Sequence, residues 1–321
     1  MVGSASWTLP YVPLDPQPTP VEPLDRLRDA LGGGPRLLVK RDDTIGFAFG
    51  GNKVRKMSLV AADAIERGAD TLITSGGVQS NHARVTAAAA ARLGLRCILV
   101  VNGTAQEKPT ANALLDRLLG AEVRYVRDRS ERAPAMDAAA EELRRQGRKP
   151  YVIPIGASTP LGAAAFVHAV AELQAQGDPP DVIVHSTSSG GTQAGIVAGC
   201  ALAGMATRVI GISADESAAV LERDIRGIID GIPGLLDVPA GRFSNLRVEV
   251  DDRFVGGGYG VPTDESREAI ELCARTEALF LDPTYTSKAM ARLIAGMRSG
   301  EFKDAGSVLF WHTGGQVGLF A

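Results

Sequence analysis

The segment Thr71-Leu-Ile-Thr-Ser-Gly-Gly-Val-Gln-Ser-Asn-His82 decides the fold class of this chain. It begins with a short strand-like run at residues 71–74, continues as a polar loop with two adjacent glycines, and opens an alanine-rich stretch that is typical of a packed helix. A buried strand, a loop and a helix in this order form the repeating unit of an open α/β fold.

Short runs of the same kind recur along the chain and alternate with amphipathic or alanine-rich stretches. The predicted strands are residues 37–40, 71–74, 97–101, 123–126, 151–154, 182–185, 209–212 and 308–311. Nearly apolar strands separated by helices indicate parallel sheets that are covered on both faces. We therefore expect two open, twisted α/β domains with mostly parallel sheets.

The composition is that of an ordinary globular protein, and the charge distribution favours a small ligand. The chain has 321 residues, of which 45% are hydrophobic and 22% charged, which is enough for two domains with a core. Its 34 basic and 37 acidic residues give a net charge of −3 without a basic stripe, so a nucleic-acid partner has no electrostatic support. Residues 1–15 show no export signal and no apolar run is long enough to span a membrane, so we expect a cytoplasmic protein.

Neither the cysteines nor the histidines show a metal-binding spacing. The three cysteines are Cys97, Cys200 and Cys273, and the four histidines are His82, His168, His185 and His312. An odd number of widely separated cysteines in apolar surroundings is typical of buried thiols in a reducing compartment. We therefore expect neither disulfides nor a metal.

The loop Gly50-Gly-Asn-Lys-Val-Arg-Lys56 places Lys53 beside two further cations. Neighbouring positive charge lowers the pKa of an amine, and a partly neutral lysine can act as a nucleophile and as an acid or base. The alternative is a solvated basic turn at the surface.

Two further loops follow predicted strands, where α/β folds place their ligands. In the first loop Ser80 or Asn81 either meets a ligand or only caps the next helix. The second loop, Ser186-Thr-Ser-Ser-Gly-Gly-Thr-Gln-Ala-Gly195, offers hydroxyls, glycines and a helix start, which together suit a phosphate. It matches neither a Walker loop nor a dinucleotide fingerprint, and a Ser/Gly-rich linker is the alternative.

Two of the five tyrosines stand in turn-like polar settings. Tyr259 lies among glycines at residues 257–262, and Tyr285 lies just before a predicted helix. Each is either a ligand contact or a buried structural tyrosine. An imine-forming lysine and a distant phosphate site, without a dinucleotide motif, together indicate pyridoxal phosphate as the cofactor.

In its spaced motifs the chain resembles the family of D-cysteine desulfhydrase and 1-aminocyclopropane-1-carboxylate deaminase, pyridoxal-phosphate enzymes of the tryptophan-synthase-β fold. The motifs run from Pro18-Thr-Pro-Val-Glu-Pro-Leu-Asp-Arg-Leu27 and Lys40-Arg-Asp-Asp43 through GGNKVRK and GGVQSNH to YGVP, DPTYTSKAM and HTGG. The resemblance implies fold type II, with the cofactor in a cleft between the two domains, and a homodimer. We expect residues 54–156 to form a smaller domain inserted into a larger one made of residues 1–53 and 157–321.

The resemblance also implies roles for single residues. Lys53 would be the Schiff-base lysine and would move the Cα proton. The other cofactor contacts would be Lys56, Asn81, Ser188, Ser189, Gly190, Gly191, Thr192 and Thr286. The substrate would meet Ser80, Asn81, His82, Tyr259 and Tyr285. The catalytic set would be Lys53, Ser80, Tyr259 and Tyr285.

Thr286 is where the chain departs from the deaminase pattern, which has a glutamate after the second tyrosine. Thr286 would face the pyridine nitrogen, and a neutral hydroxyl does not stabilise a protonated ring as a carboxylate does. We therefore expect α,β-elimination, with D-cysteine giving pyruvate, ammonia and hydrogen sulfide. L-cysteate sulfo-lyase, the cyclopropane deaminase and a non-catalytic metabolite-binding protein remain open, and the sequence does not fix the chirality of the substrate.

Overall fold

The computed structural model describes residues 9–14 and 18–321, so most of the segment considered for an export signal lies outside the described residues. The strands are β1 (Val21–Pro23), β2 (Arg36–Arg41), β3 (Thr71–Gly77), β4 (Arg96–Asn102), β5 (Glu122–Val126), β6 (Pro150–Val152), β7 (Val182–Thr187), β8 (Arg208–Ser213), β9 (Glu249–Asp251) and β10 (Ser307–His312). The α-helices are α1 (Asp25–Ala30), α2 (Asn52–Glu66), α3 (Asn81–Leu93), α4 (Ala111–Leu118), α5 (Arg132–Arg145), α6 (Pro160–Ala175), α7 (Gly191–Leu202), α8 (Ala218–Asp230), α9 (Ile232–Leu236), α10 (Asp264–Glu277) and α11 (Thr286–Arg298).

In this part of the chain the larger sheet has six strands in the order β1-β2-β10-β7-β8-β9, all parallel except for the β1–β2 pair. Successive side chains of a strand point to opposite faces, and along β7 Val182 and Val184 pack under α1, α10 and α11 while Ile183 packs under α6 and α7. The predicted parallel character is confirmed. The sequence did not predict β1 and β9, because each has three residues and acidic side chains interrupt its apolar pattern.

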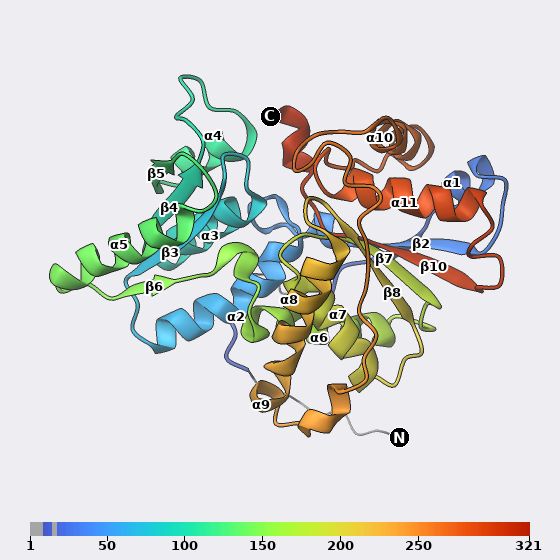
Figure 1. The fold of residues 1–321 in the computed structure, drawn as a ribbon, viewed down its shortest axis with the longest axis horizontal. Helices are drawn as coiled ribbons and strands as arrows, with labels where there is room; N and C mark the ends of the chain where they lie inside the picture. Colours follow the sequence, from blue (N-terminus) through green and yellow to red (C-terminus); the bar gives the residue numbers. More distant parts are fainter. Residues whose placement is uncertain (1–8, 15–17) are drawn as a thin grey trace.

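The smaller sheet has four parallel strands in the order β5-β4-β3-β6. Helices α2 and α3 cover the face that carries Leu72 and Leu99, and α5 covers the face that carries Ile73 and Ile98. Figure 1 shows this sheet and its helices beside the larger sheet, with α2 near the junction. Both sheets are therefore buried on both faces, as nearly apolar strands require.

The strands of the smaller sheet all lie between residues 71 and 152, and the flanking chain forms the larger sheet. We propose that the two sheets mark the inserted domain and the larger domain. Helix α2 begins at Asn52, so the predicted boundary between residues 53 and 54 falls inside its first turn. The helix packs against α3 of the smaller sheet and against α6 of the larger one. The exact division stays a prediction.

All three cysteines are free and buried, as expected for thiols in apolar surroundings. No helix of the described residues combines the length and the apolar character that a membrane crossing needs.

Candidate active site

A cavity of about 670 Å³ lies where strands of both sheets end. Parallel strands bring the loops after their carboxyl ends together, and this cavity is lined by the loops after β3, β7, β8 and β10. Of the predicted site residues, its lining includes Lys53, Ser80, Asn81, His82, Ser188, Ser189, Gly190, Thr192, Tyr259 and Tyr285. Lys56, Gly191 and Thr286 are buried and do not belong to the lining.

Two glycines set the path of the chain into α2. Gly50 has φ 68° and Gly51 has φ 98°, in the region that L side chains rarely adopt. A Cβ on Gly50 would lie 2.6 Å from the Asp43 carbonyl oxygen, and one on Gly51 would lie 2.8 Å from that of Thr313. Because the backbone passes this close to its neighbours, Lys53 in the first turn of α2 reaches the cavity.

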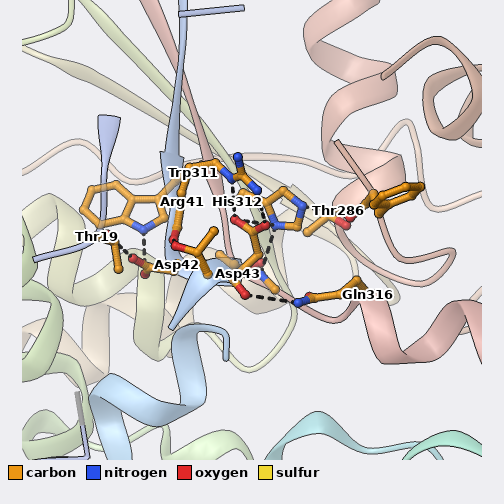
Figure 2. Close-up of polar contacts among 12 residues, drawn as sticks. Thr19, Arg41, Asp42, Asp43, Thr286, Trp311, His312 and Gln316 are labelled. Carbon is orange, nitrogen blue, oxygen red and sulfur yellow. Dashed lines mark hydrogen bonds and ion pairs between the residues drawn. The ribbon is translucent and has the colours of Figure 1, made fainter. Parts of the chain in front are cut away.

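Two aspartates in the turn after β2, which leads toward this loop, are hydrogen-bonded to surrounding segments (Figure 2). Thr19 Oγ1 donates to Asp42 Oδ1 over 2.9 Å, and the Trp311 indole donates to Asp42 Oδ2 over 2.8 Å. Gln316 Nε2 donates to the Asp43 carbonyl oxygen over 3.1 Å. These contacts tie the turn after β2 to β10 and to the C-terminal segment, and the lysine loop joins this turn where the Gly51 amide donates to the Asp42 carbonyl oxygen over 2.8 Å.

The surroundings of Lys53 keep a fraction of its amine neutral near physiological pH. Burial, and second the charge of Arg84, lower the pKa of its amine to about 8. Arg84 is held in place by donating to the Gly50 carbonyl oxygen over 3.0 Å and to Asn112 Oδ1 over 2.9 Å. The sequence suggested that Arg55 and Lys56 provide the neighbouring charge, but it comes from Arg84, and Arg55 pairs with buried Asp42. Burial and Arg84 produce the predicted effect instead.

Ser80 is both a helix cap and part of the cavity wall. Its Oγ accepts a hydrogen bond from the Ala83 amide over 3.2 Å, which caps the N-terminus of α3. A Cβ on Gly76 would lie 2.4 Å from Ser80 Oγ, so the strand end needs a glycine there. The Ser80 hydroxyl hydrogen stays available for a ligand, and the two interpretations of the sequence are compatible.

Asn81 and His82 are oriented by their neighbours. Asn81 Oδ1 accepts from Arg84 over 3.1 Å and from Asn112 over 2.9 Å, and the residue lines the cavity. His82 Nε2 lies 2.8 Å from the Thr74 hydroxyl. Burial, followed by the charges of Lys53 and Lys56, holds the pKa of His82 well below its usual value, so its ring is neutral.

The loop before α7 has the features of an anion site. Gly190, at φ 78°, turns the chain into α7, and the first amide groups of a helix have no acceptor within it. The Gly191 amide donates to Ser158 Oγ over 3.2 Å, and Ser158 and Ser189 bond to each other over 2.7 Å. Thr192 Oγ1 accepts from Asn52 over 2.9 Å, which links this loop to the lysine loop.

Lys56 supplies a buried amine at the same place. Its Nζ donates to the Gly156 carbonyl oxygen over 3.1 Å and to Ser158 Oγ over 3.3 Å. Among the described residues no carboxylate forms an ion pair with it, and burial, with the charge of Lys53 second, lowers its pKa well below the usual value. A bound phosphate would provide the missing counter-charge, so these residues fit the phosphate of a cofactor.

The two predicted tyrosines meet on the cavity wall. Their hydroxyl oxygens are 2.5 Å apart, and their rings are edge-to-face with centroids separated by 5.7 Å. Burial raises the pKa of Tyr259, and burial with the neighbouring Tyr259 raises that of Tyr285 well above its usual value. Both phenols are therefore neutral and share a hydrogen bond.

Thr286 is locked in a short loop closed by Asp282. Its hydroxyl donates to Asp282 Oδ1 over 2.7 Å and accepts from the Asp282 amide over 2.8 Å. Asp282 Oδ2 accepts from the Thr284 and Tyr285 amides, both over 2.8 Å, which fixes the direction in which Tyr285 leaves the loop. That Thr286 faces the cofactor ring stays a prediction.

The sequence missed several lining residues. Ser158 follows the predicted strand at 151–154, so its position after a strand end was an available signal. Arg129, Arg132 and Asp215 also line this cavity, but no motif in the surrounding sequence identifies them. Strands β7 and β8 lie between Arg132 and Asp215 in the chain. Only the packing of the two sheets brings them together.

Comparison with known proteins agrees with this geometry. Residues 12–314 match the family model described as pyridoxal-phosphate dependent enzyme. A 1-aminocyclopropane-1-carboxylate deaminase of Burkholderia lata is 42% identical over 97% of this chain and 96% of its own, and a D-cysteine desulfhydrase of Klebsiella pneumoniae is 39% identical over 97% and 96%. The crystal structure of a 1-aminocyclopropane-1-carboxylate deaminase homologue superposes with a TM-score of 0.91, at 37% identity over 99% of this chain and 95% of that one.

A tomato threonine deaminase has a TM-score of 0.68 at 19% identity over 93% of this chain and 79% of its own, which shows a shared fold only. The cavity with its lysine loop and anion site, on two mostly parallel sheets, defines an enzyme of the tryptophan-synthase-β fold with pyridoxal phosphate as cofactor. Within that class the chain belongs to the group of 1-aminocyclopropane-1-carboxylate deaminases and D-cysteine desulfhydrases.

Proposed function

We propose that this protein is a lyase that performs α,β-elimination on a small amino acid, and that D-cysteine is its substrate. The products would be pyruvate, ammonia and hydrogen sulfide. The observation that carries the proposal is Thr286, a neutral hydroxyl already engaged by Asp282 where the deaminase pattern has a glutamate. Expulsion of a good leaving group from Cβ requires weaker electron withdrawal by the cofactor ring than the opening of a cyclopropane does.

The residues of the cavity suit the proton transfers of such a reaction. When bound, pyridoxal phosphate supplies the electron sink for the pair released at Cα. Lys53, with a pKa of about 8, is the base that removes the Cα proton, since a useful fraction of its amine is neutral. The Ser80 hydroxyl and the Asn81 amide at the start of α3 would bind the substrate carboxylate.

The Tyr259–Tyr285 pair closes the substrate side and offers neutral phenols, which donate or accept a hydrogen bond without adding charge. Gly191, Thr192 and Lys56 would hold the cofactor phosphate. The homodimer implied by the family resemblance is part of the same proposal.

One alternative is supported by similarity. The Burkholderia relative at 42% identity is called a 1-aminocyclopropane-1-carboxylate deaminase, and this value is close to the 39% of the desulfhydrase. Ring opening would also use Lys53 and the tyrosines, so Thr286 is what separates the two candidates.

The test is pyruvate release by the purified holoenzyme from D-cysteine, L-cysteine and L-cysteate, with 2-oxobutanoate release from 1-aminocyclopropane-1-carboxylate in parallel. We expect D-cysteine to give the highest kcat/KM. Faster opening of the cyclopropane would replace the proposal by the deaminase function, and no turnover of any substrate, together with no visible cofactor band, would favour a non-catalytic binding protein.

A further inference from the structure

One end of the cavity is formed by three loops that meet beside Tyr259. Strand β3 ends at Gly77, β4 ends at Asn102 and α5 begins at Arg132. A Cβ on Gly77 would lie 3.9 Å from Asn102 Oδ1 and 4.0 Å from Tyr259 Cε1, so these groups surround one small space. Arg132 lines the cavity and donates from Nη2 to Asn102 Oδ1.

Two arginines lie at this end, and only one of them is neutralised. Arg129 pairs with Asp215 at 3.1 Å and Glu216 at 3.8 Å, and its guanidinium lies 4.9 Å from the centre of the Tyr259 ring. Within residues 9–14 and 18–321, Arg132 forms no ion pair, and its one hydrogen-bond acceptor is a neutral amide. Arg129, Arg132, Asp215 and Glu216 together sum to zero charge, but no carboxylate of the described residues contacts Arg132 directly.

Arg132 also has an unused hydrogen-bond donor. Its Nε is buried and lacks an acceptor among the described residues. A buried donor without a partner costs free energy, and a charged donor costs more than a neutral one. Because Arg132 lines the cavity and its guanidinium carries several N–H donors, an anionic oxygen or sulfur there would accept from the exposed part of the guanidinium and offset its charge.

We propose that Arg132 binds the β substituent of the substrate and receives it as an anion. This inference rests on the proposed elimination and narrows its substrate class to small amino acids whose Cβ carries a sulfonate or a thiol. The anion site at α7 serves the cofactor, so Arg132 makes a second, separate anion site for the leaving group.

The chemistry balances without an oxidant. Lys53 takes the Cα proton, the electron pair of the Cβ–S bond leaves with sulfur, and a Cα–Cβ double bond forms. Hydrolysis then consumes one water and gives pyruvate and ammonium, with hydrosulfide from cysteine or sulfite from cysteate, and Lys53 releases the Cα proton, which gives hydrogen sulfide or bisulfite. Arg132 stabilises the negative charge on the departing sulfur group.

The two leaving groups would use Arg132 at different stages. A sulfonate is charged before reaction, so loss of Arg132 weakens binding and raises KM. A thiol is neutral at pH 7 and becomes anionic only as the bond breaks, so loss of Arg132 lowers kcat. For 3-chloroalanine the chloride leaves readily and little stabilisation is lost.

The experiment compares the wild-type holoenzyme with Arg132→Gln, Arg132→Lys and the control Arg145→Gln, a change at the exposed far end of α5. We expect Arg132→Gln to lose about 10- to 100-fold in kcat/KM on D-cysteine or L-cysteate and less than about threefold on 3-chloroalanine. Arg132→Lys should recover part of the loss, and Arg145→Gln should match the wild type. A rise in KM would identify a sulfonate substituent, and a fall in kcat would identify a thiol.

A second measurement needs no turnover of the physiological substrate. Inorganic sulfite, titrated against the holoenzyme by the change in visible absorbance, should bind Arg132→Gln about 10-fold more weakly. An equal loss on all three amino acids would mean that Arg132 binds the α-carboxylate, and this would overturn the inference, as would unchanged sulfite binding. If the wild type opens the cyclopropane and eliminates from none of the three, the proposed function fails, whereas the sulfite titration still tests Arg132 as an anion site.

Discussion

Replacing Gly191 by alanine tests whether the loop before α7 holds the cofactor phosphate. The added Cβ would lie 2.7 Å from Ser158 Oγ and 2.8 Å from Lys56 Nζ, whereas ordinary contact starts at 3.4 Å. Its neighbours must therefore retreat by about 0.6–0.7 Å, which are the differences between 3.4 Å and the distances of 2.8 and 2.7 Å. Overpacking of this kind costs about 1–3 kcal/mol.

The displaced groups are the proposed phosphate ligands, so the cost should appear in cofactor affinity. A loss of about 1–3 kcal/mol weakens binding of pyridoxal phosphate about 5- to 140-fold. The assay is a titration of the apoenzyme with pyridoxal phosphate, followed by visible absorbance. Gly234→Ala is the control, because a Cβ there meets nothing within 4 Å.

The thermal midpoint of each apoenzyme separates a binding defect from a folding defect. The reasoning is refuted if Gly191→Ala lowers the melting temperature but leaves the cofactor Kd within about twofold of the wild type, because the loop would then be a structural linker.

Four further changes have defined outcomes. Lys53→Ala should fold with an unchanged melting temperature yet release no pyruvate; residual elimination would contradict its role as base. Because an amine is neutral above its pKa and that of Lys53 is about 8, capture of pyridoxal phosphate by the apoenzyme should be about tenfold faster at pH 9 than at pH 7 in stopped-flow, and a flat profile would argue against Lys53. Thr286→Val removes two hydrogen bonds between the Thr286 hydroxyl and Asp282, and it should lower the free energy of unfolding in urea by about 1–3 kcal/mol. An unchanged free energy of unfolding would contradict this role of the hydroxyl. Trp311→Phe removes the donor to Asp42 and should cost about 1.5–3 kcal/mol by the same assay; a smaller loss would mean that water replaces the indole.

Much of the fold could be predicted because its strands are short, apolar and regularly spaced. Residues 182–185 and 308–311 each lie within a buried parallel strand, since a run with both faces covered needs no polar alternation. The strand predicted at 151–154 ends at Val152 instead, because the chain turns there toward the loop that carries Gly156.

The candidate site was predictable as far as loops after strands carry recognisable residues. The segments with Lys53, Ser80 and Tyr285 each supply a cavity residue, because ligands gather at strand ends in this architecture. Arg84 could not be assigned, since an arginine in the first turns of a helix is ordinary until the Gly50 carbonyl oxygen is found beside it.

The sequence by itself therefore determined the α/β class, the loops and the lysine, because these follow from periodicity and from residue types at strand ends. Only the tertiary structure decided which charges surround each group. The pKa of Lys53 depends on burial and on Arg84, and the free charge of Arg132 depends on Asp215 pairing with Arg129 instead. Coulombic and desolvation energies depend on distance and burial in space, which local sequence does not encode.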